Sequence, residues 1–200
     1  PTEVLILGAG ITGTVAARTA LALGAQVKIF DHDITKLRKI QHYLGQQVFT
    51  SVIHPAVLFK ALASADAVIG NLRYINGSER FMISEELVKT MKPGAVIIDL
   101  SVDQGGCFET SKCRTLKNPT YEKYGVIHYC VPNISARVAR TTSMALSNIF
   151  APILLKIGLS GSVKVAIAES SGFRNGAYVY GGVLVNRLIG SYYNITSNDI

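Results

Sequence analysis

Three glycines near the start of the chain, Gly8, Gly10 and Gly13, follow the spacing G-x-G-x-x-G. The apolar residues 4–7 precede them, and residues 14–23 after them are rich in alanine and contain no proline. In a strand–turn–helix unit, such glycines allow the sharp turn, the close approach of a pyrophosphate and tight packing of the helix. Because the first N–H groups of a helix are unpaired, they can bind phosphates, and the motif predicts a dinucleotide site.

An acidic residue, Asp31, ends the next strand-like stretch, residues 26–30, and lies 18 residues after Gly13. Its carboxylate can accept hydrogen bonds from both hydroxyls of a ribose and would repel a 2′-phosphate. The pattern therefore predicts NAD as the cofactor in preference to NADP. An ordinary turn is the alternative explanation for the glycines, but the strand, the helix and the acid around them favour the dinucleotide site.

These residues need a sheet to position them, and strand-like and helix-like stretches alternate over the first 131 residues. Strands are expected at residues 4–7, 26–30, 47–50, 66–69, 95–100 and 125–131, and helices at 14–23, 34–44, 55–63 and 84–91. This alternation predicts an α/β fold with a doubly wound parallel sheet of the Rossmann type. Ligands bind at the carboxyl ends of such strands, so the segments that follow them are expected to converge on one site. The connection at residues 71–83 carries a turn signal at Asn76–Gly77.

The character of the sequence changes after this alternation. Residues 140–157 have a helical pattern that Pro152 is expected to kink or break. Gly181–Gly182 lies between two short apolar runs and predicts a two-residue hairpin, which does not belong to a doubly wound sheet. We therefore expect an NAD-binding domain at residues 1–139, and at 140–200 a linking helix and a segment of a second domain.

The composition excludes several classes of protein. The chain has 200 residues, of which 48% are hydrophobic and 16% charged, and this favours a folded domain over disorder. The net charge is +7, but the basic residues are scattered and no aromatic residues interleave with them, so no nucleic acid is expected as a partner. We see no apolar run of about 20 residues and expect no membrane span.

The cysteines indicate the cellular compartment, and the first residues indicate whether the chain is a fragment. There are three cysteines, their spacing fits no metal site, and no signal peptide is visible, so we expect no metal and a cytoplasmic protein. The chain opens at Pro1 and enters a predicted strand within three residues, which we interpret as a fragment boundary.

Two further stretches carry a resemblance to a known family. They are D-L-S-V-D-Q-G-G-C-F-E-T at residues 99–110 and H-Y-C-V-P-N at residues 128–133. With the glycine motif they closely resemble the NAD-binding region of the alanine dehydrogenase family, which is related to the alpha subunit of the NAD(P) transhydrogenase. The D-Q-G-G-C-F-E run is far more specific than the glycines and separates the two relatives, because the transhydrogenase subunit lacks the aspartate.

The resemblance implies an activity and an architecture. The reaction is the reversible oxidative deamination of L-alanine to pyruvate and ammonia, with hydride transfer to NAD. The family places its substrate-handling residues in a domain that precedes the NAD-binding domain, and the end of the chain packs on that domain. This chain alone is then expected to be inactive. The family also implies a homo-oligomer, a hexamer or a dimer.

The resemblance also assigns site residues by position. Asp103 matches the active-site aspartate beside the nicotinamide. Cofactor contacts are assigned to Gly8, Gly10, Ile11, Thr12, Gly13, Asp31, Lys36, Leu72, Leu100, Asp103, Val131, Asn133 and Ile134.

Some of these assignments have simpler alternatives. Asp103 could be a turn-forming residue, although its position after a buried strand favours a site role. Lys36 could equally be an ordinary surface residue. Ile134 stands where the family usually has Met, and Asn76–Gly77 where the family has Pro-Gly. His128 is expected to be a core or site-edge histidine and not a general base. Cys107 is expected to be a small residue packed in a turn, with a reactive thiol as the alternative.

Two alternative functions stay open on the sequence. A transhydrogenase alpha-type subunit would bind NADH and pass hydride to another subunit without alanine activity. A non-catalytic NAD-binding module would sense or regulate.

Overall fold

The computed structural model describes residues 1–72 and 82–198, and the predicted turn at Asn76–Gly77 lies outside this range. The chain divides into two compact units, Pro1–Ile134 and Ser135–Ile200, each described here by itself. The sequence placed the boundary after residue 139, five residues later. The expectation that the second unit packs on another domain stays a prediction.

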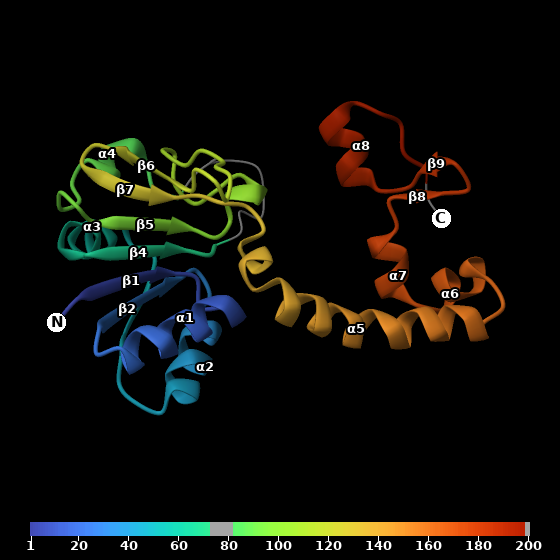
Figure 1. The fold of residues 1–200 in the computed structure, drawn as a ribbon, viewed down its shortest axis with the longest axis horizontal. Helices are drawn as coiled ribbons and strands as arrows, with labels where there is room; N and C mark the ends of the chain where they lie inside the picture. The colour runs from blue at the N-terminus through green and yellow to red at the C-terminus, as the bar shows by residue number, and fades with distance from the viewer. Residues whose placement is uncertain (73–81, 199–200) are drawn as a thin grey trace. The chain divides into compact units, whose positions relative to one another are not determined.

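The first unit is built on a mostly parallel sheet (Figure 1). Within the described residues its strands are β1 Glu3–Leu7, β2 Gln26–Asp31, β3 Phe49–Val52, β4 Ala67–Gly70, β5 Val96–Asp99, β6 Thr120–Lys123 and β7 Val126–Tyr129. Their order is β3-β2-β1-β4-β5-β7-β6, and every neighbouring pair is parallel except β6 and β7. The predicted Rossmann-type α/β fold is confirmed, and all six predicted strands are present.

The edge strand β6 is the strand that the sequence analysis missed. Its sequence, Thr-Tyr-Glu-Lys, is not an apolar run, because an edge strand is only half covered. It joins β7 through Tyr124 and Gly125, which both have positive φ, at 56° and 72°. Two such residues in a row form the kind of turn that matches the twist of an antiparallel hairpin.

Helices cover both faces of the sheet, which explains why its inner strands are apolar almost throughout. Helices α1 Ile11–Ala22 and α2 Ile34–Leu44 pack on one face, and α3 Pro55–Ser64 and α4 Glu85–Val88 pack on the other. Each face of the sheet has its own hydrophobic core, and alternate residues of β1 pack in the two cores. Val4 and Ile6 lie on the α1 side, and Leu5 and Leu7 lie on the α3 side.

The helix boundaries follow local signals. Helix α2 has the predicted bounds, since Asp33 accepts a hydrogen bond from Thr35 N at 2.8 Å and Gly45 ends the helix at φ 66°. Helix α1 begins three residues earlier than predicted. Helix α4 ends at Val88 although the pattern predicted helix to residue 91, since the last predicted residues form turns.

The second unit contains α5 Ala139–Leu159, α6 Val163–Glu169, α7 Ser171–Gly176, β8 Val179–Tyr180, β9 Val183–Leu184 and α8 Arg187–Tyr193. Helix α5 runs through Pro152 without a break, so of the kink or break that the sequence predicted, the break is absent. The hairpin is confirmed, with β8 and β9 antiparallel around Gly181 and Gly182, both at positive φ.

One finding differs from the expectation about membranes. The helical stretch Ile134–Leu159 is long and apolar enough to cross a membrane, with a mean hydropathy of 1.4. Polar residues such as Arg140 and Lys156 interrupt its apolar runs, which is why a search for an unbroken run passed over it. Length and composition alone do not separate such a helix from the long helix of a soluble protein, so the absence of a membrane partner stays a prediction.

Candidate functional site

The glycine turn between β1 and α1 is shaped by what surrounds each glycine. Gly8 has φ +112°, and a Cβ there would lie 2.7 Å from Asn71 O. A Cβ on Gly13 would lie 1.8 Å from Gly8 O, so α1 passes against the turn at a distance that only glycine allows.

Gly10 differs from both, and the difference is what a ligand requires. A Cβ on Gly10 would meet nothing within 4 Å, and this residue is the N-cap of α1 without a side-chain cap. The space beside Gly10 is therefore open at the N-terminus of α1, which is the positive end of the helix dipole. Ile11 and Thr12, next to this space, are exposed. These residues fit the phosphates of a dinucleotide.

Asp31 ends β2 and is tied to the same turn. Its side chain is buried, and Oδ2 accepts a hydrogen bond from Ala9 N at 2.8 Å while Oδ1 accepts one from Asp33 N at 2.9 Å. Gly8 N also donates to Phe30 O over 2.7 Å, which joins the ends of β1 and β2. An ionised carboxylate has about four acceptor positions, so Asp31 can still accept from ribose hydroxyls.

The ends of β1, β4 and β5 are joined to one another by their backbones. Asn71 N donates to Leu7 O at 2.8 Å, and Leu100 N donates to Gly70 O at 2.8 Å. The predicted contact residues Leu72 and Leu100 follow these strands and are half-buried. They therefore lie along the carboxyl edge on which Gly8 and Asp31 lie.

Asp103 lies in the loop that follows β5. It forms a single turn of 3₁₀ helix, Val102–Gln104, with its own side chain exposed. The turn is closed by hydrogen bonds from Gln104 N and Gly106 N to Ser101 O, each 2.9 Å. This geometry leaves the Asp103 carboxylate accessible at the carboxyl edge.

The remaining predicted residues differ in their burial. Val131 follows β7 and is buried, while Asn133 and Ile134 are exposed, and Asn133 has φ 53°. Lys36 is exposed on the first turn of α2, just beyond Asp31. The sheet thus brings the segments after β1, β2, β4, β5 and β7 to one edge, as parallel strands require.

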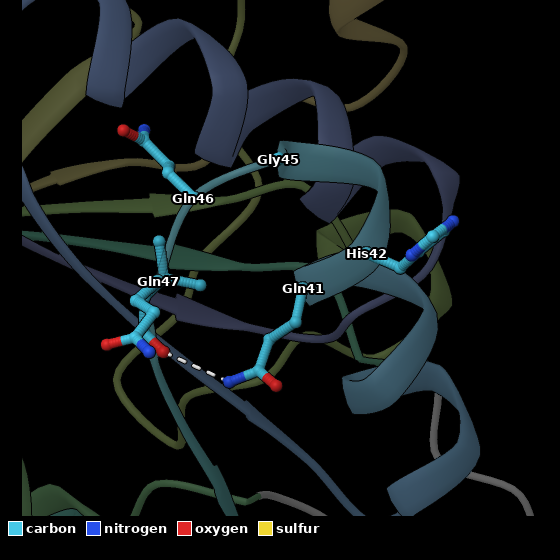
Figure 2. A pocket seen from close by; sticks show the side chains of 6 residues that line it. Gln41, His42, Gly45, Gln46 and Gln47 are labelled. Atoms are coloured by element: carbon cyan, nitrogen blue, oxygen red, sulfur yellow. Dashed lines mark hydrogen bonds between the residues drawn. The ribbon is translucent and has the colours of Figure 1, made fainter.

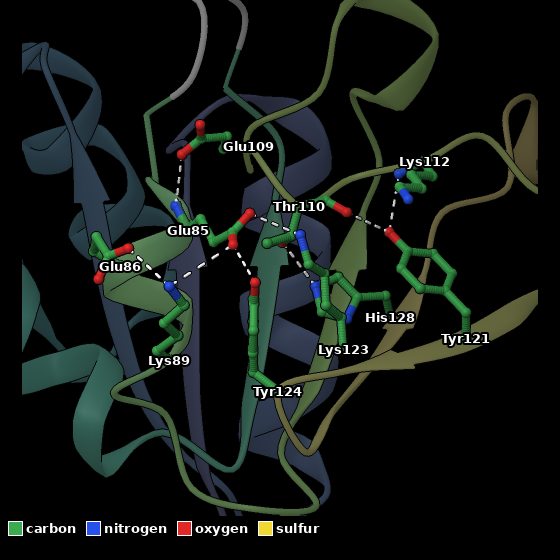
Figure 3. A network of polar contacts seen from close by, with 10 residues as sticks. All are labelled: Glu85, Glu86, Lys89, Glu109, Thr110, Lys112, Tyr121, Lys123, Tyr124 and His128. Atoms are coloured by element: carbon green, nitrogen blue, oxygen red, sulfur yellow. Dashed lines mark hydrogen bonds and ion pairs between the residues drawn. The ribbon is translucent and has the colours of Figure 1, made fainter.

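His128 lies in the core of β7, as predicted. Its Nδ1 donates to Val126 O at 2.9 Å, and Nε2 is 2.8 Å from Thr110 Oγ1 (Figure 3). Because Nδ1 carries the proton in the neutral ring, the hydroxyl of Thr110 donates to Nε2. Burial lowers the pKa of His128, so the ring is neutral and both nitrogens are engaged.

The two buried cysteines, Cys107 and Cys130, have the environment of packed side chains. All three are free thiols, and Cys107 is buried, with burial raising its pKa to about 12. A thiol in that state is inert, which agrees with a packing role. No cluster of three or more His, Cys, Asp or Glu residues that could hold a metal lies in the part of the chain that the structure describes.

A polar network links α4 to the β6–β7 hairpin (Figure 3). The carboxylate of Glu85 accepts from Lys123 Nζ at 2.7 Å and from the hydroxyl of Tyr124, and it lies 3.8 Å from Lys89 Nζ. Hydrogen bonds from Lys123 and Tyr124 lower the pKa of Glu85 to about 2. No sequence pattern predicts this pairing, because Lys123 and Tyr124 lie 38 and 39 residues after Glu85.

A shallow pocket of about 470 Å³ lies elsewhere on the first unit (Figure 2). It is lined by Gln41, His42, Gly45, Gln46, Gln47 and Val48. These residues run from the end of α2 to the start of β3, the edge opposite the carboxyl ends of the strands. Because of this location, the pocket is not the predicted site. Its Gln41 amide donates to Val48 O and Thr50 Oγ1.

A family model described as "Alanine dehydrogenase/PNT, C-terminal domain" matches residues 1–187. The chain belongs to this family. The resemblance that the D-Q-G-G-C-F-E run and the glycines predicted is therefore confirmed.

Relatives of known name agree with membership in the alanine dehydrogenase/PNT family. Alanine dehydrogenase from Bacillus subtilis (strain 168) is 41% identical over 175 residues, which cover 87% of this chain and 46% of that protein. A solved structure of an L-alanine dehydrogenase has a TM-score of 0.87 at 34% identity and covers 97% of this chain and 53% of its own.

A second solved structure shares the fold. A transhydrogenase from Sinorhizobium meliloti has a TM-score of 0.70 at 23% identity, with coverage of 94% of this chain and 50% of its own. At that identity the likeness shows the fold alone. The chain spans about half the length of the curated family members that it matches.

Proposed function

We propose that this chain is the NAD-binding part of an alanine dehydrogenase, which oxidatively deaminates L-alanine to pyruvate and ammonia and catalyses the reverse reaction. The observation that carries the proposal is the open N-terminus of α1 above Gly10, with a buried acid, Asp31, beside it. The sequence relatives named alanine dehydrogenase support the reaction.

Different residues of the chain hold the phosphates, the adenosine ribose and the nicotinamide half of the cofactor. The first N–H groups of α1, with Ile11 and Thr12, bind the phosphates, and Asp31 accepts from the adenosine ribose. Because a 2′-phosphate would meet the Asp31 carboxylate, the site selects NAD over NADP. Leu72, Leu100 and Val131 flank the nicotinamide half, where NAD supplies the acceptor for the hydride.

Asp103 is the chain's own residue nearest to the reaction in this proposal. Its exposed carboxylate, on a short turn beyond β5, orients the reacting amine or holds the nicotinamide ribose. Asn133 and Ile134 complete the nicotinamide side, and Lys36 borders the adenosine side. The other residues that bind the amino acid are expected in another domain of the complete protein.

The alternative is a transhydrogenase alpha-type subunit, which would bind NADH without alanine activity. The D-Q-G-G sequence that carries Asp103 and the higher identity to alanine dehydrogenases favour the dehydrogenase. We also propose that the complete protein is cytoplasmic and forms a homo-oligomer, a hexamer or a dimer.

The test is L-alanine-dependent reduction of NAD by the complete protein that contains this sequence, with NADP and glycine in parallel assays. We expect reduction with NAD and alanine, and much less with NADP. Tight NADH binding without any alanine-dependent reduction would instead support the transhydrogenase-type or the non-catalytic NAD-binding function.

A further inference from the structure

A second aspartate, Asp99, ends β5 four residues before Asp103 and has the opposite environment. It is buried, with 1% of its surface exposed, whereas Asp103 is exposed. Its position at the carboxyl end of the strand places it directly under the loop of residues 101–111. A buried carboxylate is costly unless its oxygens are hydrogen-bonded, so its partners show what it does.

Three hydrogen bonds join Asp99 to three points of that loop. Ser101 N donates to Oδ1 at 3.0 Å, and Cys107 N donates to Oδ2 at 2.8 Å. The hydroxyl of Ser111 donates to Oδ2 at 2.5 Å. The carboxylate thus fixes the beginning, the middle and the end of the loop around itself.

The loop has a backbone that permits this close approach. Gly106 has φ +81°, and a Cβ on it would lie 2.8 Å from Asp99 Oδ2. Ser101, which donates to Asp99, also closes the short turn that carries Asp103, since its carbonyl accepts from Gln104 N and Gly106 N. The turn of Asp103 is therefore built between two of the three points that Asp99 holds.

We propose that Asp99 is a positioning residue that acts through Asp103. Its carboxylate fixes the loop of residues 101–111 so that the Asp103 carboxylate is held at the carboxyl edge of the sheet. This inference rests on the proposed function, because it gives Asp103 a role in the alanine reaction. The oxygens of Asp99 are engaged by Ser101, Cys107 and Ser111 of this loop, so its action on the reaction is indirect.

The requirement is for a carboxylate and not merely for a polar side chain. An aspartate offers acceptors on both oxygens, whereas an asparagine replaces one of them by an NH₂ donor. In Asp99→Asn that donor would face a backbone N–H, either that of Ser101 or that of Cys107. Ser111→Ala removes one of the three hydrogen bonds and leaves the carboxylate intact, so it should have a smaller effect.

The first measurement is amide hydrogen exchange of the chain, compared between the original protein and Asp99→Asn. We expect faster exchange in residues 101–111 and unchanged exchange in β1 and α1, because the loop loses hydrogen bonds to residue 99 while the sheet stays paired. Asp66→Asn is the matched control, since Asp66 accepts from Glu3 N and Lys92 Nζ at the opposite edge of the sheet. Unchanged exchange in residues 101–111 would overturn the proposal whatever the activity.

The second measurement is a double-mutant cycle on turnover by the complete protein, with Asp99→Asn, Asp103→Asn and the double variant. We expect Asp99→Asn to lower kcat by about 30-fold when Asp103 is present, and by less than about threefold when Asp103 is already Asn. NADH affinity, measured by fluorescence titration, should stay within about threefold in both single variants.

A merely structural role for Asp99 would give a different pattern. It would lower kcat by the same factor in both backgrounds and weaken NADH binding as well, and this result would overturn the positioning role. If the original protein shows no alanine activity, the proposed function fails together with the catalytic consequence drawn here. The exchange measurement still decides whether Asp99 holds the loop.

Discussion

The backbone N–H of Ala9 donates a hydrogen bond to Oδ2 of Asp31 over 2.8 Å. Ala9 lies inside the glycine turn, between Gly8 and Gly10, and Asp31 lies at the end of the neighbouring strand. The group expected to bind the adenosine ribose therefore also fixes the turn expected to bind the phosphates. A substitution of Asp31 should therefore weaken the binding of both the adenosine ribose and the phosphates.

For this reason Asp31→Ala is expected to lower NADH affinity by about tenfold or more, since it removes a charged hydrogen-bond acceptor and frees Ala9 N. The gap between NADH and NADPH affinity should narrow, because the repulsion of a 2′-phosphate disappears. Fluorescence titration with both nucleotides measures this. Asp33→Asn, which keeps the cap of α2, is the control and should change neither affinity. An unchanged preference for NADH in Asp31→Ala would mean that Asp31 does not contact the ribose.

Gly10 and Gly13 offer a matched pair that separates binding from folding. Gly10→Ala should lower thermal stability only slightly, because the new Cβ meets nothing and φ is −77°, and the remaining cost is that Ala is a poorer N-cap than Gly. The same variant should lower NADH affinity by about tenfold or more. Gly13→Ala should destabilise the fold itself, since its Cβ would lie 1.8 Å from Gly8 O. Thermal melting and NADH titration on both variants check this, and full NADH affinity in Gly10→Ala would place the phosphates elsewhere.

Asp103→Asn is expected to lower turnover of the complete protein sharply, by about 100-fold, and to leave NAD affinity within a few fold. Because the Asp103 side chain is exposed, its replacement should change the reaction and not the stability of the fold. The melting temperature should therefore stay the same. Steady-state kinetics with alanine and NAD measure kcat separately from KM. Turnover equal to that of the original protein would remove Asp103 from the mechanism.

Glu85 predicts a pH dependence of stability. Its pKa is lowered from 4.5 to about 2 by the hydrogen bonds from Lys123 and Tyr124. A carboxyl group whose pKa is lowered on folding stabilises the fold above its unfolded pKa, and this contribution is lost as the pH falls from about 4.5 towards 2. The effect should be small because the group is partly exposed to solvent and its ion pairs are screened.

The measurement is thermal melting of the original protein and of Glu85→Gln at pH values from 7 to 2. The two proteins should differ at pH 7 and converge as the pH approaches 2. Glu122→Gln on β6, whose side chain is exposed, is the control and should run parallel to the original protein. A constant difference between the original protein and Glu85→Gln at every pH would show that the ion pairs contribute nothing.

The parts of the fold that the sequence predicted are those with local signals. The glycine turn, helix α2 with its Asp33 cap, and the hairpin at Gly181–Gly182 each depend on residues next to one another. Strand β6 was missed, since its half-covered edge position demands no apolar run. The break considered at Pro152 is absent, because one lost hydrogen bond does not end a helix of 21 residues.

The candidate site was predictable to a similar degree. Gly8, Gly13 and Asp31 are identified by spacing alone, and Asp103 by a family motif. The role of Asp99 was not visible in the sequence, although it stands in the same motif. Its partners, Cys107 and Ser111, lie 8 and 12 residues away, and only the folded loop brings them to its carboxylate.

The antiparallel strand β6 has a consequence for how copies of the chain can meet. It forms one border of the sheet and has the sequence Thr-Tyr-Glu-Lys, short and charged, with Lys123 already engaged by Glu85. Borders of this kind resist the addition of a strand from another molecule, because charges would be brought against the incoming chain. Self-association by continuation of the sheet, the first step towards fibrous aggregates, is therefore disfavoured at β6.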